Sequence, residues 1–321
     1  MCQKTRVPSR GSLGDRYPSA ALLRYPDEFS RRSEHRNLVI TRPALLAIDV
    51  GNSRIKYGWF VEEPLSNGRA WPECRHFTVG ALTCPAPWDR IRSWTDPLQC
   101  DVAIAGSNPA VVEQIATHWQ ATTGRTPWVV RDRHCLPIRV DVDSPERVGL
   151  DRLLNAVAAN ELRPQAQGAI VIDSGTATTV DVVSREGSFA GGAILPGFAL
   201  SSRALHDYTA LLPELSLSEL GPELPAALGT ETRAALRSGI YWGQVGAIRQ
   251  LVQELCREMD WNSPSSGAGP TAGLPNCWLV LTGGGGPWLE RQFPGAPQIA
   301  SLAMHGLVLT AWAQGIGSPA Q

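Results

Sequence analysis

Two short segments of the chain share a residue pattern that suits phosphate binding. Residues 47–53 read Ala-Ile-Asp-Val-Gly-Asn-Ser and residues 171–177 read Val-Ile-Asp-Ser-Gly-Thr-Ala, so an apolar run ends in Asp-x-Gly-[Asn/Thr] both times. A glycine at such a turn lets the backbone approach a ligand closely. The N–H groups beside it, with the side chains of Asn52, Ser53 and Thr176, can donate to phosphate oxygens. The repeat predicts a phosphate clamp with one turn on each side of a cleft.

The acid in each turn, Asp49 or Asp173, cannot bind phosphate directly, because like charges repel each other. Each carboxylate can instead hold a cation, directly or through water, that bridges to phosphate. Around Asp173 the hydroxyls of Thr176, Thr178 and Thr179 would complete an oxygen-only ligand set, which suits a hard cation. The alternative is structural, with both acids acting only as caps of their turns.

Lysine usage adds a further candidate for phosphate binding. The chain has 27 Arg but only two Lys, which are Lys4 and Lys56. The compact ammonium of Lys56 can act as a point charge at a phosphate where a planar guanidinium does not fit. The alternative is an exposed residue on a strand.

The segment Gly149-Leu150-Asp151-Arg152 stands at the start of an expected helix. A hydroxyl that attacks the γ-phosphate of a nucleotide needs a proton acceptor, and an Asp performs this role in kinases. Asp151 is therefore a candidate general base, and Arg152 a candidate ligand for an anionic substrate. The alternative is that Asp151 only complements the helix dipole in the first turn.

The elements that must position these residues follow from periodicity and turn signals. We expect strands at 45–50, 54–61, 101–105, 128–130, 169–173, 178–183, 188–195 and 278–281, and helices at 109–119, 150–162, 199–210, 231–257 and 300–314. Residues 62–100 show no clear period, and 261–275 read as a low-complexity surface loop. Glycines within 191–197 predict closely packed backbone beside the second turn, while those at 283–286 either admit a flat adenine or only form a loop. Two equivalent strand–turn–strand units predict two related α/β halves that face one cleft.

Composition limits the classes of function. The chain has 321 residues, 43% of them hydrophobic, with a formal net charge of −1, so it can bury a sizeable core and has little field to attract a polyanion. These values exclude wholesale disorder and general nucleic-acid binding, and no apolar run is long enough for a membrane span. Seven cysteines without a Cys-x-x-Cys pair indicate reduced thiols of a cytoplasmic protein, and the six scattered histidines lack the spacing of a zinc site.

Residues 1–43 differ from the rest of the chain in charge. They contain nine basic and four acidic residues, are rich in Arg, Ser and Pro, and show no periodicity. We expect a passive, basic, disordered tail. A nucleic-acid contact, a transit peptide and an artefact of start-codon choice are alternatives, although transit peptides usually avoid acids such as Asp15 and Glu34.

Six stretches, taken in order, resemble the type III pantothenate kinases of the acetate and sugar kinase/Hsp70/actin superfamily. They are DVGNSRIK (49–56), GLDRLLNAVAA (149–159), DSGTATTVDVV (173–183), GGAILPG (191–197), TRAALRSGIYWG (232–243) and LTGGGG (281–286). The resemblance spans about residues 44–318. It implies two duplicated RNase H-like (actin-like ATPase) domains flanking a nucleotide cleft, with a tail at 1–43, an N-terminal half at 44–148 and a C-terminal half at 149–321.

The same resemblance implies an activity and its partners. The enzyme would transfer the γ-phosphate of ATP to pantothenate and release 4'-phosphopantothenate, the first step of coenzyme A biosynthesis. It would use Mg²⁺ and a monovalent cation, K⁺ or NH₄⁺, and would form a cytoplasmic homodimer with its substrate site near the interface. Neither nucleic acid nor a membrane is an expected partner.

The resemblance also assigns roles to residues that match the family motifs. ATP would contact Asp49, Val50, Gly51, Asn52, Ser53, Arg54, Ile55, Lys56 and Thr176, and pantothenate would contact Gly149, Leu150, Asp151, Arg152 and Thr232. Asp151 would be the catalytic proton acceptor, and Asp173 the ligand of the monovalent cation.

Two positions depart from the family pattern, and two other functions stay open. Ser53 replaces a usual Thr, and Val142 stands where members often carry a substrate-contacting Tyr, a change that we expect to weaken one side of the pantothenate site. One alternative is another phosphotransferase or phosphohydrolase of the superfamily, such as an exopolyphosphatase-like enzyme, which would need no Gly-x-Asp-Arg motif. The other is a non-catalytic regulator similar to the Bvg accessory factors. A regulator could lose Asp151 or Asp173, and this chain keeps both.

Overall fold

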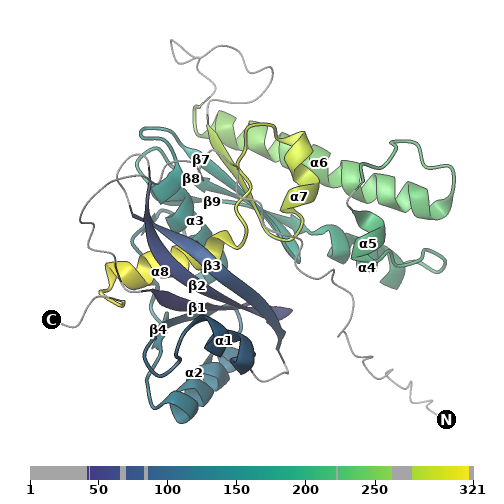
Figure 1. Ribbon diagram of the computed structural model, residues 1–321. Coiled ribbons are helices and arrows are strands. Elements are labelled where there is room, and N and C mark those ends of the chain that lie inside the picture. The colour runs from purple at the N-terminus through teal and green to yellow at the C-terminus, as the bar shows by residue number, and fades with distance from the viewer. Residues whose placement is uncertain are drawn as a thin grey trace, which may run out of the picture.

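The computed structural model describes residues 42, 44–65, 70–82, 86–221, 223–261 and 277–317. Two five-stranded sheets form its centre (Figure 1), with strand orders β3-β2-β1-β4-β5 and β10-β7-β8-β9-β6. Except for Arg42, the predicted tail lies outside the described residues, as does the predicted loop 261–275 beyond Trp261.

The elements have the following bounds. The first sheet contains β1 (Leu45–Val50), β2 (Arg54–Pro64), β3 (Ala70–Ala81), β4 (Asp101–Gly106) and β5 (Trp128–Val129). The second contains β6 (Arg139–Val140), β7 (Ala169–Ser174), β8 (Ala177–Val183), β9 (Ser188–Pro196) and β10 (Trp278–Thr282). The α-helices are α1 (Trp88–Trp94), α2 (Pro109–Thr123), α3 (Leu150–Leu162), α4 (Phe198–Asp207), α5 (Leu217–Leu220), α6 (Thr232–Glu258), α7 (Gly286–Leu289) and α8 (Leu302–Ala313).

Both sheets contain the same four-strand unit. In the first sheet, β1 pairs antiparallel with β2 and parallel with β4, while β2 pairs antiparallel with β3. In the second sheet, β7 pairs antiparallel with β8 and parallel with β10, while β8 pairs antiparallel with β9. The shared unit confirms the predicted pair of related α/β halves and the predicted fold class.

The elements stack in five layers, with α3 and α8 between the two sheets (Figure 1). Along β1, Leu45 and Ala47 face this central layer, whereas Leu46 and Ile48 face an outer layer built by α1 and α2. The split follows from the alternation of side chains along a strand. Helix α6 covers the outer face of the second sheet. A buried strand therefore needs apolar residues on both faces, which is why β1 and β7 read as continuous apolar runs.

The central layer depends on a close approach of two helices. A Cβ at Gly306 of α8 would overlap the backbone of Leu154 in α3. Helix α8 also contacts β1, β3 and β4, so this late helix packs onto the first sheet. Almost all of its 12 residues are buried, yet neither it nor another helix in the described ranges is long and apolar enough to cross a membrane.

The structure corrects the sequence reading in two regions. Within the stretch 62–100, read as aperiodic, β3 and α1 form. Strand β3 lies at the edge of its sheet and mixes Pro72, charged residues and exposed positions with buried ones, so its pattern carries no clean alternation. Trp261, assigned to the surface loop, is buried against Gly168. The helix expected over 150–162 has those bounds in the structure.

Candidate active site

A cleft of about 400 Å³ lies where the two predicted phosphate turns meet. Ten of the residues assigned from sequence line it, namely Asp49, Gly51, Asn52, Ser53, Arg54, Lys56, Asp151, Arg152, Asp173 and Thr176. Val50 and Ile55 instead point into the core beneath the first sheet. Neither Gly149 nor Leu150 lines the cleft, although both stand beside Asp151 at the start of α3.

The two turns are closed by similar backbone hydrogen bonds but differ in length by one residue. Gly51 N donates to Arg54 O at 3.0 Å, three positions on, whereas Gly175 N donates to Ala177 O at 3.0 Å, two positions on. Ser53 from the first turn faces Thr176 from the second, with 3.5 Å between their hydroxyl oxygens. Both turns thus present hydroxyls and backbone from opposite sides of one space, as a phosphate clamp requires.

Lys56 forms an ion pair with the acid of the first turn. It lies opposite Asp49 in the register of β1 and β2, and its Nζ is 3.0 Å from Asp49 Oδ2. Burial alone would lower the pKa of this ammonium, but the carboxylates of Asp49 and Asp173 outweigh it and the net shift is upward. The lysine therefore stays charged and places a cation between the two acids.

Asp173 at the end of β7 is held by Asn155 of α3, which donates from Nδ2 to Asp173 Oδ2 at 2.8 Å. Burial raises the pKa of Asp173, an effect that Lys56 and Asn155 oppose. Asn155 was not predicted as a site residue, although it lies one turn after Asp151 on the same helix face. Thr179 pairs with Asp173 across the strands, whereas Thr178 pairs with Ser174 and points to the other face of the sheet. The predicted place of Thr178 near Asp173 is therefore wrong.

Asp151 and Arg152 lie in the first turn of α3 and line the cleft. The Asp151 side chain is exposed and accepts from the backbone N–H of Arg152 at 2.9 Å. The Arg152 guanidinium is bound to Asp181 of β8, a buried acid that the sequence reading did not single out. Its position two residues after Thr179 on one strand face could have revealed it.

The glycine-rich segments pack as backbone beside the second turn. A Cβ at Gly197 would overlap the carbonyl groups of Gly175 and Thr176, which agrees with the predicted close packing. Gly283 has φ +81° and lies against Asp173, so only a residue without a side chain fits there. Gly283 and Gly284 line the cleft, and contact with an adenine remains a prediction.

Thr232 does not lie in this cleft. It lines a separate groove of about 810 Å³ between α4 and α6, together with Leu205, Tyr208, Leu236 and Ile240. Within one chain, Thr232 is thus placed apart from the other residues assigned to pantothenate.

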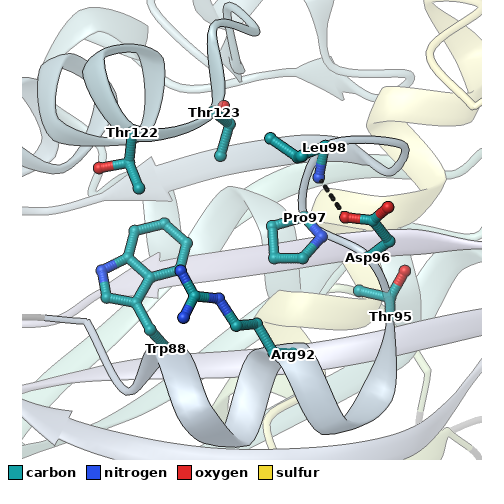
Figure 2. A pocket seen from close by; sticks show the side chains of 8 residues that line it. All are labelled: Trp88, Arg92, Thr95, Asp96, Pro97, Leu98, Thr122 and Thr123. Carbon is teal, nitrogen blue, oxygen red and sulfur yellow. Dashed lines mark hydrogen bonds between the residues drawn. The ribbon is translucent and has the colours of Figure 1, made fainter.

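Another hollow, of about 410 Å³, contains none of the predicted site residues. Figure 2 shows its lining from α1, the loop that follows and the end of α2, with Trp88 and Arg92 on one side and Thr122 and Thr123 on the other. The two predicted phosphate turns line the cleft between the sheets and not this hollow.

The oxygen atoms around Asp173 suit a hard cation better than a transition metal. No cluster of three or more His, Cys, Asp or Glu suited to a metal occurs in the described part of the chain. Asn155 Oδ1 is buried without a hydrogen-bond partner among the described residues, beside the Asp173 carboxylate. An unpartnered acceptor next to a partly buried carboxylate provides oxygen ligands for a hard cation.

Known proteins share this sequence and fold. The family model for type III pantothenate kinase matches residues 45–254. The chain is 34% identical over 279 residues to the type III pantothenate kinase of Gluconobacter oxydans (strain 621H), covering 83% of this chain and 92% of that protein. It is 38% identical over 175 residues to that of Ruegeria pomeroyi (strain ATCC 700808 / DSM 15171 / DSS-3), covering 54% and 65%.

A solved structure adds support for the fold alone. The crystal structure of a Baf family protein from Campylobacter jejuni aligns with a TM-score of 0.51 and 17% identity, over 84% of this chain and 98% of that one. The regulator alternative gains nothing from this likeness, because identity so low reports architecture and not activity. The family model matches well over half of the chain, one relative aligns over most of its length, and the two predicted phosphate turns meet in one cleft. The chain therefore belongs to the type III pantothenate kinase family.

Proposed function

We propose that this protein transfers the γ-phosphate of ATP to the primary hydroxyl of pantothenate and releases ADP and 4'-phosphopantothenate. The observation that carries the proposal is the cleft, which joins both phosphate turns to Asp151. Asp151 accepts the hydroxyl proton while the hydroxyl oxygen bonds to the γ-phosphorus and the bond from that phosphorus to the leaving oxygen of ADP breaks.

The ATP phosphates lie between the two turns in this proposal. Asn52, Ser53 and Thr176 donate hydrogen bonds, and Lys56 supplies a positive charge that its pairing with Asp49 keeps in place. Mg²⁺ would neutralise part of the phosphate charge, and Asp49 would hold it through water.

A monovalent cation, K⁺ or NH₄⁺, would bind at Asp173. The supporting features are the partly buried carboxylate, the unpartnered Asn155 Oδ1 and the hydroxyls of Thr176 and Thr179. When bound, the cation supplies positive charge between Asp173 and the phosphates, which would otherwise repel each other.

A homodimer is part of the same proposal, with a second copy of the chain on the groove between α4 and α6. Three large apolar side chains near this groove are exposed: Tyr208, Leu211 and Leu228 expose 89%, 91% and 80% of their surface. Exposed apolar side chains that gather in one region mark interaction surfaces. Pairing two copies there would bury these side chains, and any role for Thr232 in pantothenate binding would then involve the neighbouring copy. Sedimentation should give a dimer mass, and Leu211→Glu should shift it toward the monomer.

Two further predictions belong to the proposal. We place the boundary between the halves near residue 148, ahead of α3, although α8 returns to pack on the first sheet. We also place the enzyme in the cytoplasm, where its nucleotide substrate is made available to a biosynthetic kinase.

Release of ADP, measured with pantothenate, with related pantoyl compounds and with no acceptor, tests the function. ADP release that requires pantothenate and yields a phosphorylated product supports it. Equal release without an acceptor would instead favour the phosphohydrolase alternative, and the absence of turnover with every acceptor would favour the regulator.

A further inference from the structure

The guanidinium of Arg152 is held by a buried acid on a neighbouring strand. Arg152 Nε donates to Asp181 Oδ1 at 2.9 Å, and Nη2 donates to the same oxygen. The Asp181 side chain is fully buried, while the Arg152 side chain keeps 15% of its surface exposed. Thr179 donates to the second carboxylate oxygen at 2.8 Å, so both oxygens of Asp181 are occupied by protein donors.

Two further residues shape the space around this pair. The guanidinium lies over the ring of Phe189, 5.4 Å from its centroid, which restrains its plane. Gly192 lies opposite Asp181 in the register of β8 and β9, and a Cβ at Gly192 would overlap the Asp181 side chain. The strand β9 therefore leaves room for the acid, and the acid and the ring together fix the direction of the guanidinium.

A contribution to the stability of the fold does not by itself explain this buried ion pair. Burial raises the pKa of Asp181 to about 6 although Arg152 and Thr179 oppose the shift, so the charged acid is held against a cost in desolvation. Buried ion pairs are often no more stabilising than apolar residues of the same volume. The pair stands at the cleft, where Arg152 follows Asp151 directly, and Nη1 of Arg152 has no hydrogen bond to any described residue.

We propose that Asp181 is a positioning residue that holds Arg152 so that its remaining nitrogen, Nη1, binds the carboxylate of the acceptor substrate. The inference rests on the proposed function, because pantothenate is the acceptor that carries this carboxylate. Asp181 touches no reacting atom and acts through Arg152. Without Asp181 the Arg152 guanidinium is no longer held in place. This loss should weaken binding of the substrate carboxylate more than it slows phosphoryl transfer.

The test compares Asp181→Asn with the unmodified enzyme on two acceptors, pantothenate and a neutral pantothenamide that lacks the carboxylate. We expect the KM for pantothenate to rise about tenfold or more, while kcat changes less than threefold. A tenfold rise corresponds to the loss of about one charge-assisted hydrogen bond. The KM for the pantothenamide and for ATP should stay unchanged. A purely structural role would move all of these constants together.

A double-mutant cycle then asks whether Asp181 acts through Arg152. In an Arg152→Gln background, Asp181→Asn should cause no further rise in the KM for pantothenate, because residues that share one interaction are not additive. Additive effects would overturn the inference. Asp141→Asn is the matched control, since Asp141 pairs with Arg139 on the surface and should leave all constants unchanged.

Two outcomes separate this inference from the proposed function. If the unmodified enzyme does not phosphorylate pantothenate, the proposed function fails. If it does, but Asp181→Asn keeps the normal KM for pantothenate, only the role of Asp181 fails. Should Asp181→Asn not fold, Asp181→Ser, which is smaller and still accepts a hydrogen bond, must show the same split between the two acceptors.

Discussion

Ser53 Oγ and Thr176 Oγ1 lie 3.5 Å apart across the cleft, although 123 positions separate them in the sequence. Each hydroxyl ends a turn that follows the buried strand of its own sheet, β1 or β7. The two sheets are held in this relation by the shared layer of α3 and α8, in which Gly306 allows the helices to touch. A phosphate chain that enters the cleft would meet donors from both halves at once.

Replacement of Asp151 by Asn should abolish most of the turnover and leave ATP binding intact. The exposed carboxylate stands in the cleft at the start of α3, and the amide cannot accept the hydroxyl proton. Loss of a general base should lower kcat by about 10²–10⁴. Steady-state kinetics measures the loss and calorimetric titration with ATP measures the binding. Near-normal turnover by the purified variant would remove Asp151 from the mechanism.

Potassium or ammonium should lower the apparent KM for ATP, and Asp173→Ala should erase this dependence together with most activity. The reason is the partly buried Asp173 carboxylate in the cleft, whose repulsion of the ATP phosphates a bound cation would relieve. Activity is measured in K⁺, in NH₄⁺ and in a buffer whose only monovalent cation is a bulky organic amine. Asn155→Ala should also weaken the cation response, because it removes the unpartnered oxygen. Full activity in the organic buffer would reduce Asp173 to a turn cap.

The free energy of unfolding should decrease as the pH falls from 6.5 toward 4 because of His305. This histidine is buried against Trp71 and Phe60, with Nδ1 2.7 Å from Pro72 O, and burial lowers its pKa from 6.5 to about 4. Below pH 6.5 the imidazole binds a proton in the unfolded chain but not in the native protein. The contribution of neutral His305 to the free energy of unfolding is therefore complete above this pH and is lost as the pH falls below it. The loss totals about 3 kcal/mol by pH 4, at about 1.4 kcal/mol per pH unit.

Urea unfolding of His305→Gln against the parent protein checks this. The variant should be less stable at pH 7, and the difference should narrow toward pH 4, whereas His134→Gln, at an exposed position, should track the parent at every pH. A constant difference between His305→Gln and the parent would show that His305 does not titrate on unfolding.

A chain that begins at Arg42 should fold and turn over like the full-length protein. Residues 1–41 carry a basic, aperiodic composition, while Arg42 itself makes contacts with the body. Its backbone N donates to Glu62 at 2.6 Å and its guanidinium lies 5.1 Å from the centroid of the Trp312 ring. Soluble expression and kcat/KM for both substrates measure the outcome. Loss of either would show that the removed segment packs onto the body.

The sequence alone predicted much of the fold, because the local signals were strong. Buried strands of apolar residues end in Asp-x-Gly turns at residues 49–51 and 173–175, and the helix at 150–162 lies between Gly149 and Pro164. The repeat of one strand–turn–strand unit then indicated two related halves. Strand β3 escaped prediction since it is an edge strand whose pairing with β2, and not its own pattern, makes it a strand.

The sequence predicted the site residues that stand in motifs, but it did not identify the residues that contact them. Asp49, Asp151 and Asp173 stand in recognisable motifs, and each lines the cleft. Asn155 and Asp181 share a helix or strand face with Asp151 and Thr179, but an Asn inside a helix or an Asp on a strand acquires its role only from the side chain that it meets in the fold.

The alternation of side chains along β8, a local property, turned Thr178 away from Asp173. Tertiary structure decided two other relations: it placed Thr232 in a separate groove and brought Asp181 to Arg152 across 29 positions of the chain. The physical reason is common to both: residue type and spacing determine which local element forms and which face a side chain takes, whereas the packing of elements far apart in sequence determines which polar groups meet in a buried cleft.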